Sequence, residues 1–152
     1  MDRKPILVTG STSLADTPEA KAWAVEALRR ELAGCTELWE CGRPGTVDEW
    51  AVRVAEGLRP QPWRMHQYSN GTAAAFRPSP QGNKERWVLY SFLEARVQLV
   101  ELFKIMFPRG TVLALLAPWS QETDVDFVVK QAREFRLRGV ELVCPAELGP
   151  EG

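Results

Sequence analysis

The stretch ILVTGSTSLADTPEA, residues 6–20, decides the fold class of this chain. Residues 6–8 form a short apolar run that Gly10 ends, which is typical of a strand buried on both faces of a parallel sheet. Thr17 and Pro18 then predict the start of a helix, with the threonine hydroxyl as N-cap and the proline in the first helical position. A buried strand followed directly by a helix predicts an α/β protein.

Strands and helices continue to alternate along the rest of the chain. Further strands are predicted at 37–41, 63–67, 111–117 and 140–144, and helices at 46–57, 84–107 and 123–138. Residues 68–82, with glycine, asparagine and proline breaks, predict a long loop. The pattern predicts one Rossmann-like domain over residues 1–152. Its five-stranded parallel sheet would have the order 3-2-1-4-5, with helices on both faces.

Composition excludes several classes of protein. The net charge of -1 gives no electrostatic basis for binding nucleic acid. Three cysteines and one histidine argue against a disulfide framework or a zinc site, and favour reduced thiols in the cytoplasm. The apolar run near the N-terminus is too short for a signal peptide or a membrane span. We expect a cytoplasmic protein without a metal or a cofactor.

The opening stretch also argues against a nicotinamide-dependent dehydrogenase. A dinucleotide pyrophosphate needs close backbone approach at a helix N-terminus, which a G-x-G-x-x-G pattern provides. Here no glycine follows Gly10 until Gly34. The chain also contains no Tyr-x-x-x-Lys pair.

A second turn, CGRPGTVDEWAVRVAEG at residues 41–57, carries G-x-x-G and then D-x-x-A-x-x-x-A. Together with V-T-G-S at residues 8–11, it resembles the small Rossmann-like members of the SLOG superfamily, and most closely their YspA-like branch. The resemblance implies a nucleotide, nucleotide-sugar or ADP-ribose-type ligand that is sensed or processed. Gly10 and Ser11 match the first turn of that pattern, Gly42 and Gly45 the second, and Asn83 a third element.

The position of the ligand site follows from the sheet order. In an open α/β sheet, ligands bind beyond the carboxyl ends of the strands, where the strand order reverses. That rule points to residues 10–13 and 118–121, with residues 42–46 beside them. The candidate ligand-binding residues are Gly10, Ser11, Thr12, Ser13, Gly42, Arg43, Gly45, Thr46, Asn83, Lys84, Arg86, Trp119 and Ser120.

Anion binding has two candidate locations. The turn at residues 42–46 is either a phosphate cradle or an ordinary tight turn, and acidic residues at three helix N-termini disfavour phosphate there. Lys84 and Arg86, in the first turn of the predicted helix at 84–107, would instead attract an anion. Trp119 either stacks on a base or packs against a helix.

Catalysis is the alternative to binding. Release of a base from a ribose phosphate requires a carboxylate beside an oxocarbenium-like centre, and Glu49 or Asp48 is the candidate. Both also fit a structural role in a capping box that begins at Thr46. His66, near the end of the predicted strand at 63–67, either faces the site as a catalytic candidate or is a core or surface residue. A third alternative is an interacting subunit with a vestigial pocket.

The predicted helix at 84–107 also suggests self-association. Between residues 97 and 107, only Gln98, Glu101 and Lys104 interrupt an apolar run. A helix that is apolar nearly all round must be covered on more than one side. We therefore expect a homodimer through this helix.

Overall fold

The computed structural model describes residues 3–67, 72–78, 85–91, 99–120 and 123–151. Thirteen elements follow one another along these residues. They are β1 (Pro5–Gly10), η1 (Thr12–Ala15), α1 (Pro18–Glu31), β2 (Glu37–Glu40), α2 (Val47–Glu56), β3 (Trp63–Gln67), β4 (Thr72–Pro78), β5 (Glu85–Ser91), α3 (Leu99–Met106), β6 (Thr111–Leu116), α4 (Thr123–Glu134), β7 (Arg138–Val143) and η2 (Ala146–Leu148).

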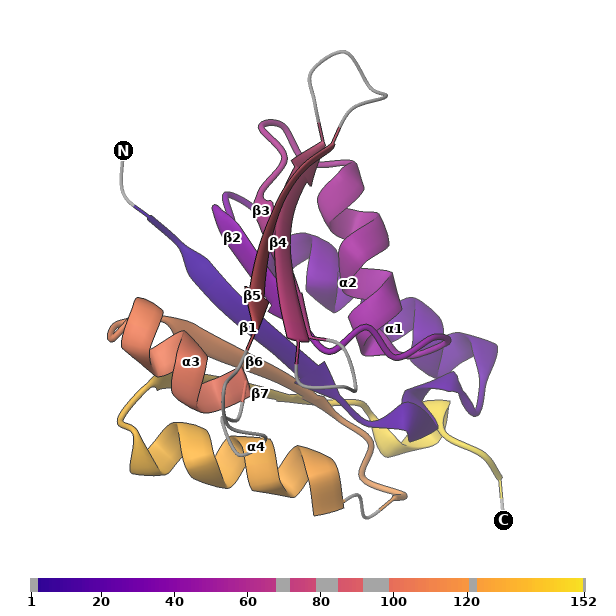
Figure 1. Cartoon of the computed structure of the whole chain (residues 1–152). Coiled ribbons are helices and arrows are strands. Elements are labelled where there is room, and N and C mark those ends of the chain that lie inside the picture. Colours follow the sequence, from indigo (N-terminus) through magenta and orange to yellow (C-terminus); the bar gives the residue numbers. More distant parts are fainter. Residues whose placement is uncertain (1–2, 68–71, 79–84, 92–98, 121–122, 152) are drawn as a thin grey trace.

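The strands form one seven-stranded sheet in the order β5-β4-β3-β2-β1-β6-β7 (Figure 1). β3, β2, β1, β6 and β7 pair in parallel, which confirms the predicted parallel sheet and its order 3-2-1-4-5. β4 and β5 are antiparallel and extend the sheet beyond β3. The predicted five-stranded parallel sheet is therefore present, and the whole sheet has two further strands that the sequence did not predict.

The added pair also corrects two predictions between residues 68 and 107. β4 lies inside the predicted loop at 68–82, and β5 occupies residues that were assigned to the helix at 84–107. Only 99–106 of that predicted helix are helical among the described residues. The β5 sequence is rich in aromatic and β-branched residues, which fit a pleated surface. Pairing with β4 at seven positions, from Thr72 with Ser91 to Pro78 with Glu85, fixes them in a strand.

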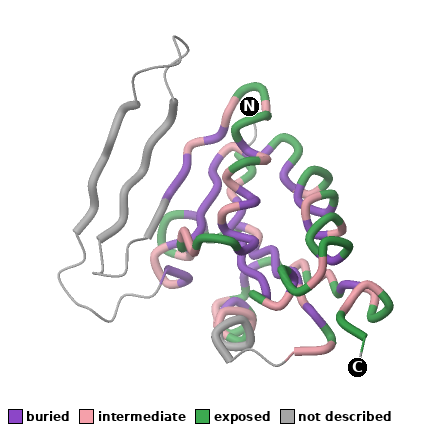
Figure 2. Tube along the Cα trace, turned by 90° about the vertical axis from the view of Figure 1, so that its right-hand side faces the viewer, coloured by how far each residue is buried: buried purple, intermediate pink, exposed green. Residues whose placement is uncertain are grey.

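Two hydrophobic cores lie on opposite faces of the sheet. α1 and α2 cover one face, where they pack on Ile6 and Val8 of β1. α3 packs on the other face against Leu7 and Trp39, and the Trp39 and Phe103 rings lie edge to face at 5.2 Å. Successive strand residues point to opposite faces, so β1 supplies both cores. Helices on both faces are thus confirmed, with buried positions on the central strands and the inner sides of the helices (Figure 2).

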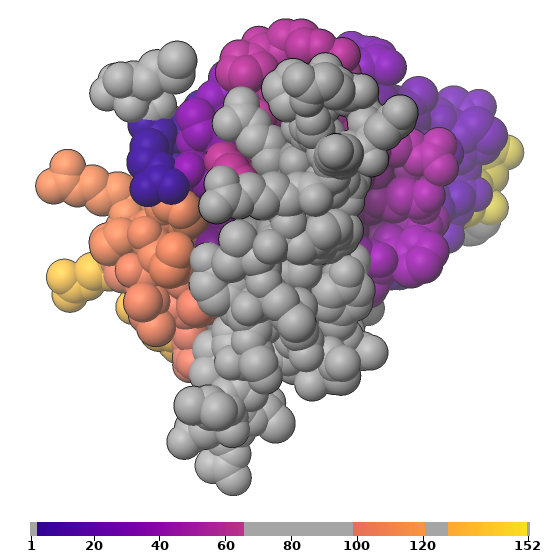
Figure 3. Space-filling view, turned by 45° about the horizontal axis from the view of Figure 1, so that its top comes forward, coloured from indigo at the N-terminus to yellow at the C-terminus, as the bar shows by residue number. Residues whose placement is uncertain are grey.

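The space-filling view separates these two helical layers, with α2 on one side of the molecule and α3 on the other (Figure 3). Among the described residues, no helix combines the length and the apolar character that crossing a membrane would need.

Local signals set several element ends. Thr17 caps α1 by accepting a hydrogen bond from the Ala20 N–H at 3.1 Å, as predicted. Gly34 follows α1 with a φ of 76°. The last helix ends earlier than expected, at residue 134 instead of about 138, and Gly139 lies inside β7. Arg136, with a φ of 57°, lies in the turn between them.

Candidate functional site

The first strand-to-helix connection is a closed 3-10 turn. The Ser11 N–H donates to the Leu115 carbonyl at 2.9 Å, which ties the end of β1 to β6. The Ser11 hydroxyl accepts a hydrogen bond from the Ser13 N–H at 3.1 Å and so caps η1. Thr12 is exposed and Ser13 half-buried. This turn places small hydroxyl side chains at the carboxyl edge of the sheet, where the sequence predicted them.

Gly10 is required by packing between β1 and α2. A Cβ atom at Gly10 would lie 2.5 Å from Val47 Cγ2 and 3.1 Å from the Leu115 carbonyl oxygen. Val47 is fully buried at the start of α2. The sequence placed Gly10 among the candidate ligand-binding residues, and the structure gives this glycine a packing role, because a core side chain approaches it closely.

The second connection, residues 41–46, bends through two glycines. Gly42 has a φ of 74° and Gly45 a φ of 71°, values that non-glycine residues adopt only at a cost. A Cβ atom at Gly45 would meet nothing within 4 Å. Gly45 is therefore required by backbone conformation, because the space beside it is open.

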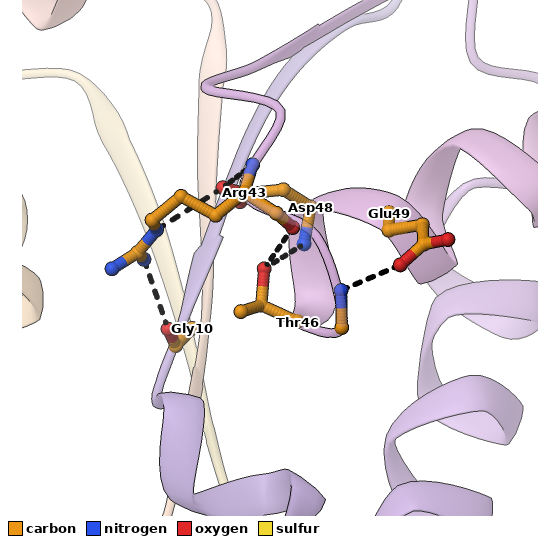
Figure 4. Close-up of polar contacts among 6 residues, drawn as sticks. Gly10, Arg43, Thr46, Asp48 and Glu49 are labelled. Atoms are coloured by element: carbon orange, nitrogen blue, oxygen red, sulfur yellow. Dashed lines mark hydrogen bonds and ion pairs between the residues drawn. The ribbon is translucent and has the colours of Figure 1, made fainter. Parts of the chain in front are cut away.

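Carboxylates of the chain itself occupy the N–H groups of this connection (Figure 4). Asp48 Oδ2 accepts from the Arg43 N–H at 3.2 Å, and Glu49 Oε2 accepts from the Gly45 N–H at 2.5 Å. Thr46 caps α2 as predicted: its hydroxyl accepts from the Asp48 N–H and donates to the Arg43 carbonyl. A phosphate at this turn would have to displace both carboxylates from these donors. The geometry favours the tight-turn alternative over the phosphate cradle.

Arg43 connects the second turn to the first. Its Nε lies 3.4 Å from Asp48 Oδ2, and its Nη2 donates to the Gly10 carbonyl at 3.4 Å (Figure 4). The Asp48 side chain is almost completely buried, with 2% exposed, whereas 35% of the Arg43 side chain remains exposed. Arg43 thus balances a buried carboxylate and still presents part of a guanidinium group at the switch point of the sheet.

Glu49 is held as an anion. The hydrogen bond from the Gly45 N–H, and after it that from Arg53, lowers the pKa of the Glu49 carboxyl below its ordinary value. Arg53 Nη2 lies 3.0 Å from Glu49 Oε1. Both Glu49 carboxylate oxygens are thus engaged by groups of the chain, one by the Gly45 N–H and the other by Arg53. Glu49 and Asp48 are therefore arranged as helix caps more than as catalytic groups.

The third connection, after β6, uses Trp119 for packing. Its indole N–H donates to Asp16 Oδ2 at 3.2 Å, across to the first connection. A Cβ atom at Gly149 would lie 2.4 Å from the indole ring, so the C-terminal backbone passes directly against it. The Ser120 N–H donates to the Ala117 carbonyl at 3.2 Å. The packing alternative for Trp119 is the one that this geometry supports.

Of the remaining candidates, the structure describes the backbone of Arg86 and His66. Arg86 lies in β5 opposite Arg77, on the outermost strand, so the prediction that it lies in the first turn of a helix was wrong. Asn83 and Lys84 lie outside the described residues. His66 lies in β3 in register with Glu40, and its side chain is likewise outside the described part.

Glu40, which the sequence pattern did not single out, is a carboxylate at the carboxyl end of β2 with 1% of the residue exposed. It directly precedes the second connection. Arg64, also buried, lies on the neighbouring strand β3 and pairs with Glu56 at 3.4 Å. Buried charges in proteins are normally paired, and these two residues place buried charge on neighbouring strands of the sheet. The signal that pointed to Glu40 was an acidic residue at the end of a short buried strand.

The structure also contains a groove that the sequence did not predict. It has a volume of about 700 Å³, lies between α1 and α2, and meets the second connection at Gly45 and Glu49. Within the described ranges, no three histidine, cysteine or acidic side chains gather closely enough to hold a metal ion.

Comparison with known proteins does not assign the chain to a family: no family model, no curated protein and no solved structure matches it. The resemblance to the SLOG superfamily therefore still depends on the short motifs at residues 8–11 and 41–57. The function has to be inferred from the contacts of the three connections.

Proposed function

We propose that the protein binds a nucleotide-type ligand at the carboxyl ends of β1, β2 and β6, and that it binds this ligand without turning it over. The observation that carries the proposal is the position of Arg43. Its partly exposed guanidinium spans from the second connection to the Gly10 carbonyl at the end of β1. Open α/β sheets bind their ligands at this place.

In this binding mode, an anionic group of the ligand contacts Arg43 and not the N–H groups of the turn. Asp48 and Glu49 already occupy those N–H groups. The exposed Thr12 would face the uncharged part of the ligand. The three cysteines are all free, which favours a reducing compartment such as the cytoplasm.

The second candidate function is a nucleotide N-glycosidase that uses Glu49 or Asp48. The cap contacts of both carboxylates count against it. Release of free base from AMP, abolished in Glu49→Gln, would favour the enzyme over the binding protein. The third candidate is an interacting subunit with a vestigial pocket. Two hydrogen bonds favour it, from Arg43 to the Gly10 carbonyl and from Trp119 to Asp16, because they join the connections to one another where a ligand would otherwise bind.

The test is calorimetric titration with AMP, ADP-ribose, UDP-glucose and adenosine. Arg43→Gln should weaken the binding free energy of AMP by roughly 1.5–3 kcal/mol, the contribution of a charge-assisted hydrogen bond. The affinity for adenosine, which has no phosphate, should be unchanged. Arg53→Gln is the matched control, because Arg53 is exposed and pairs with Glu49 away from Gly10. The proposal fails if none of the four compounds binds, or if folded Arg43→Gln binds AMP as tightly as the parent.

We also propose a homodimer through α3. The sequence suggested an apolar helix over residues 97–107, whereas in α3 the exposed large apolar side chains are those of Ile105 and Met106. Leu99, Val100 and Phe103 face the core, whereas Ile105 is 72% exposed and Met106 47% exposed. Two adjacent large apolar side chains on one helix are a candidate contact. Light scattering at micromolar concentration should give twice the monomer mass, and Ile105→Lys should return it to the monomer value. A monomeric parent protein would refute the dimer.

A further inference from the structure

The groove between α1 and α2 has an apolar floor. Trp50 is only 4% exposed and lies in the groove lining with Val25, Val54 and Leu58, which are partly buried against the same core. The groove volume of about 700 Å³ lies within the range of ligand-binding clefts. Figure 1 shows the two helices side by side on one face of the sheet.

The rim of the groove is basic although the whole chain is not. Among the described residues that line it, Lys21, Arg29 and Arg53 carry positive charge and only Glu49 carries negative charge. The chain as a whole has a net charge of -1. Three cations against one carboxylate leave the groove lining with a net positive charge, and the Glu49 carboxylate is held by the Gly45 N–H and by Arg53.

The carboxylates that now pair with Arg29 and Arg53 can be replaced by carboxylates of a ligand. Arg29 pairs with Glu26 within α1, and both side chains are more than 60% exposed. Arg53 is 74% exposed. Exposed pairs of this kind contribute little to stability, so an incoming carboxylate can replace them at small cost. The Lys21 ammonium lies 5.5 Å from the centre of the Trp50 ring, directly above the apolar floor.

The spacing of the cations selects the kind of partner. Lys21 and Arg29 lie on one helix eight residues apart, which is about 12 Å at 1.5 Å per residue. Arg53 stands on the opposite helix. This spacing is several times the span of one carboxylate or phosphate group, so it suits a ligand with more than one acidic group. An extended peptide of about four residues covers it, at roughly 3.3 Å per residue.

We propose that this groove docks an acidic, amphipathic peptide segment of a partner protein. Carboxylates of the segment contact Lys21, Arg29 and Arg53, and an apolar side chain between them rests on Val25 and Val54. The site is separate from the proposed nucleotide site, although Gly45 and Glu49 border both. Charge complementarity along the rim sets orientation and association rate, and the apolar floor supplies contact area.

The test is fluorescence anisotropy with two labelled pentapeptides of alternating sequence, one of glutamate and leucine and one of lysine and leucine. The acidic peptide should bind and the basic one should not, and binding should weaken as salt is raised. The double variant Lys21→Gln, Arg29→Gln should lower the affinity for the acidic peptide about three- to tenfold, as expected for the loss of two exposed ion pairs. Val54→Thr, which keeps the side-chain shape, should weaken it about threefold through loss of apolar contact.

The matched control is Arg30→Gln with Arg133→Gln, which removes the same charge outside the groove lining and should leave binding unchanged. The proposal is overturned if the acidic peptide does not bind, or if the control pair weakens it as much as the groove pair. It is also overturned if N-acetylglutamate binds as tightly as the peptide, because the groove would then be a site for a small anion. AMP titration of the same variants keeps this result distinct from the proposed function.

Discussion

Replacing Gly10 with alanine tests whether the first turn is shaped by packing or by a ligand. The added Cβ would lie 2.5 Å from Val47 Cγ2 and 2.9 Å from Val47 Cβ, and contacts below 3.0 Å force a shift. It would also lie 3.1 Å from the Leu115 carbonyl oxygen, which already accepts the Ser11 N–H. Neither neighbour can move freely, since Val47 is fully buried and the carbonyl belongs to β6.

We expect Gly10→Ala to lower the free energy of unfolding by about 2–3 kcal/mol, the upper part of the range for overpacking a core. Backbone strain adds nothing, because Gly10 is not among the glycines with positive φ. Val47→Ala alone should cost about 2 kcal/mol through loss of two buried methyl groups. The double variant should cost at least about 1 kcal/mol less than the sum, because Val47→Ala removes the closest contact.

Urea unfolding followed by tryptophan fluorescence gives these free energies by linear extrapolation. Gly139→Ala is the matched control, since a Cβ there would meet nothing within 4 Å, and it should be neutral or slightly stabilising. Strictly additive single variants, or a Gly10→Ala protein as stable as the parent, would refute the packing argument. A stable Gly10→Ala protein that has lost AMP binding would instead support a ligand role for Gly10.

Three further predictions concern the second turn and the thiols. Gly45→Ala should cost about 1 kcal/mol in the same unfolding assay through its φ of 71° alone, and no loss would show that the turn tolerates a side chain. Because the folded pKa of Glu49 is lowered, its stabilising effect is present above the ordinary pKa of 4.5 and is lost as pH falls through the lower folded value. Glu49→Gln should remove that acid-side loss, and an unchanged pH profile would contradict the assignment. Cys41 is exposed, whereas Cys35 and Cys144 are buried. Desolvation raises the pKa of both the Cys41 and the Cys35 thiols to about 12, so access of the reagent and not thiol acidity distinguishes them. Ellman's reagent should therefore label Cys41 first at pH 8, and Cys41→Ser should abolish the fast phase.

Local chemistry made the first half of the chain predictable. The apolar run at 6–8, the Thr17 cap and the Thr46 cap each depend on groups within a few residues, so the sequence shows them directly. Because strands and helices alternate, the rules for right-handed connections allow only a few arrangements of the parallel strands. The order 3-2-1-4-5 is one of them, and the structure has it.

Residues 72–91 could not be assigned in the same way. The stretch 85–91 suits a strand or a helix by composition, and no glycine or proline separates it from α3. Its hydrogen bonds go to β4, and those of β4 to β3, so its conformation depends on a sheet edge that residues elsewhere build. β propensity depends on such cross-strand neighbours more than on the residue itself.

The sequence by itself determined the α/β class, the parallel strand order and the residues of the turns that follow β1 and β2, because periodicity, caps and turns are short-range properties. Only the tertiary structure decided what those residues do there. Gly10 faces Val47 across 37 positions, Arg43 reaches the Gly10 carbonyl, and Trp119 bonds to Asp16. Such contacts depend on how separate elements pack. Differences of a few tenths of an ångström in packing distance decide them, and no local sequence pattern encodes such differences.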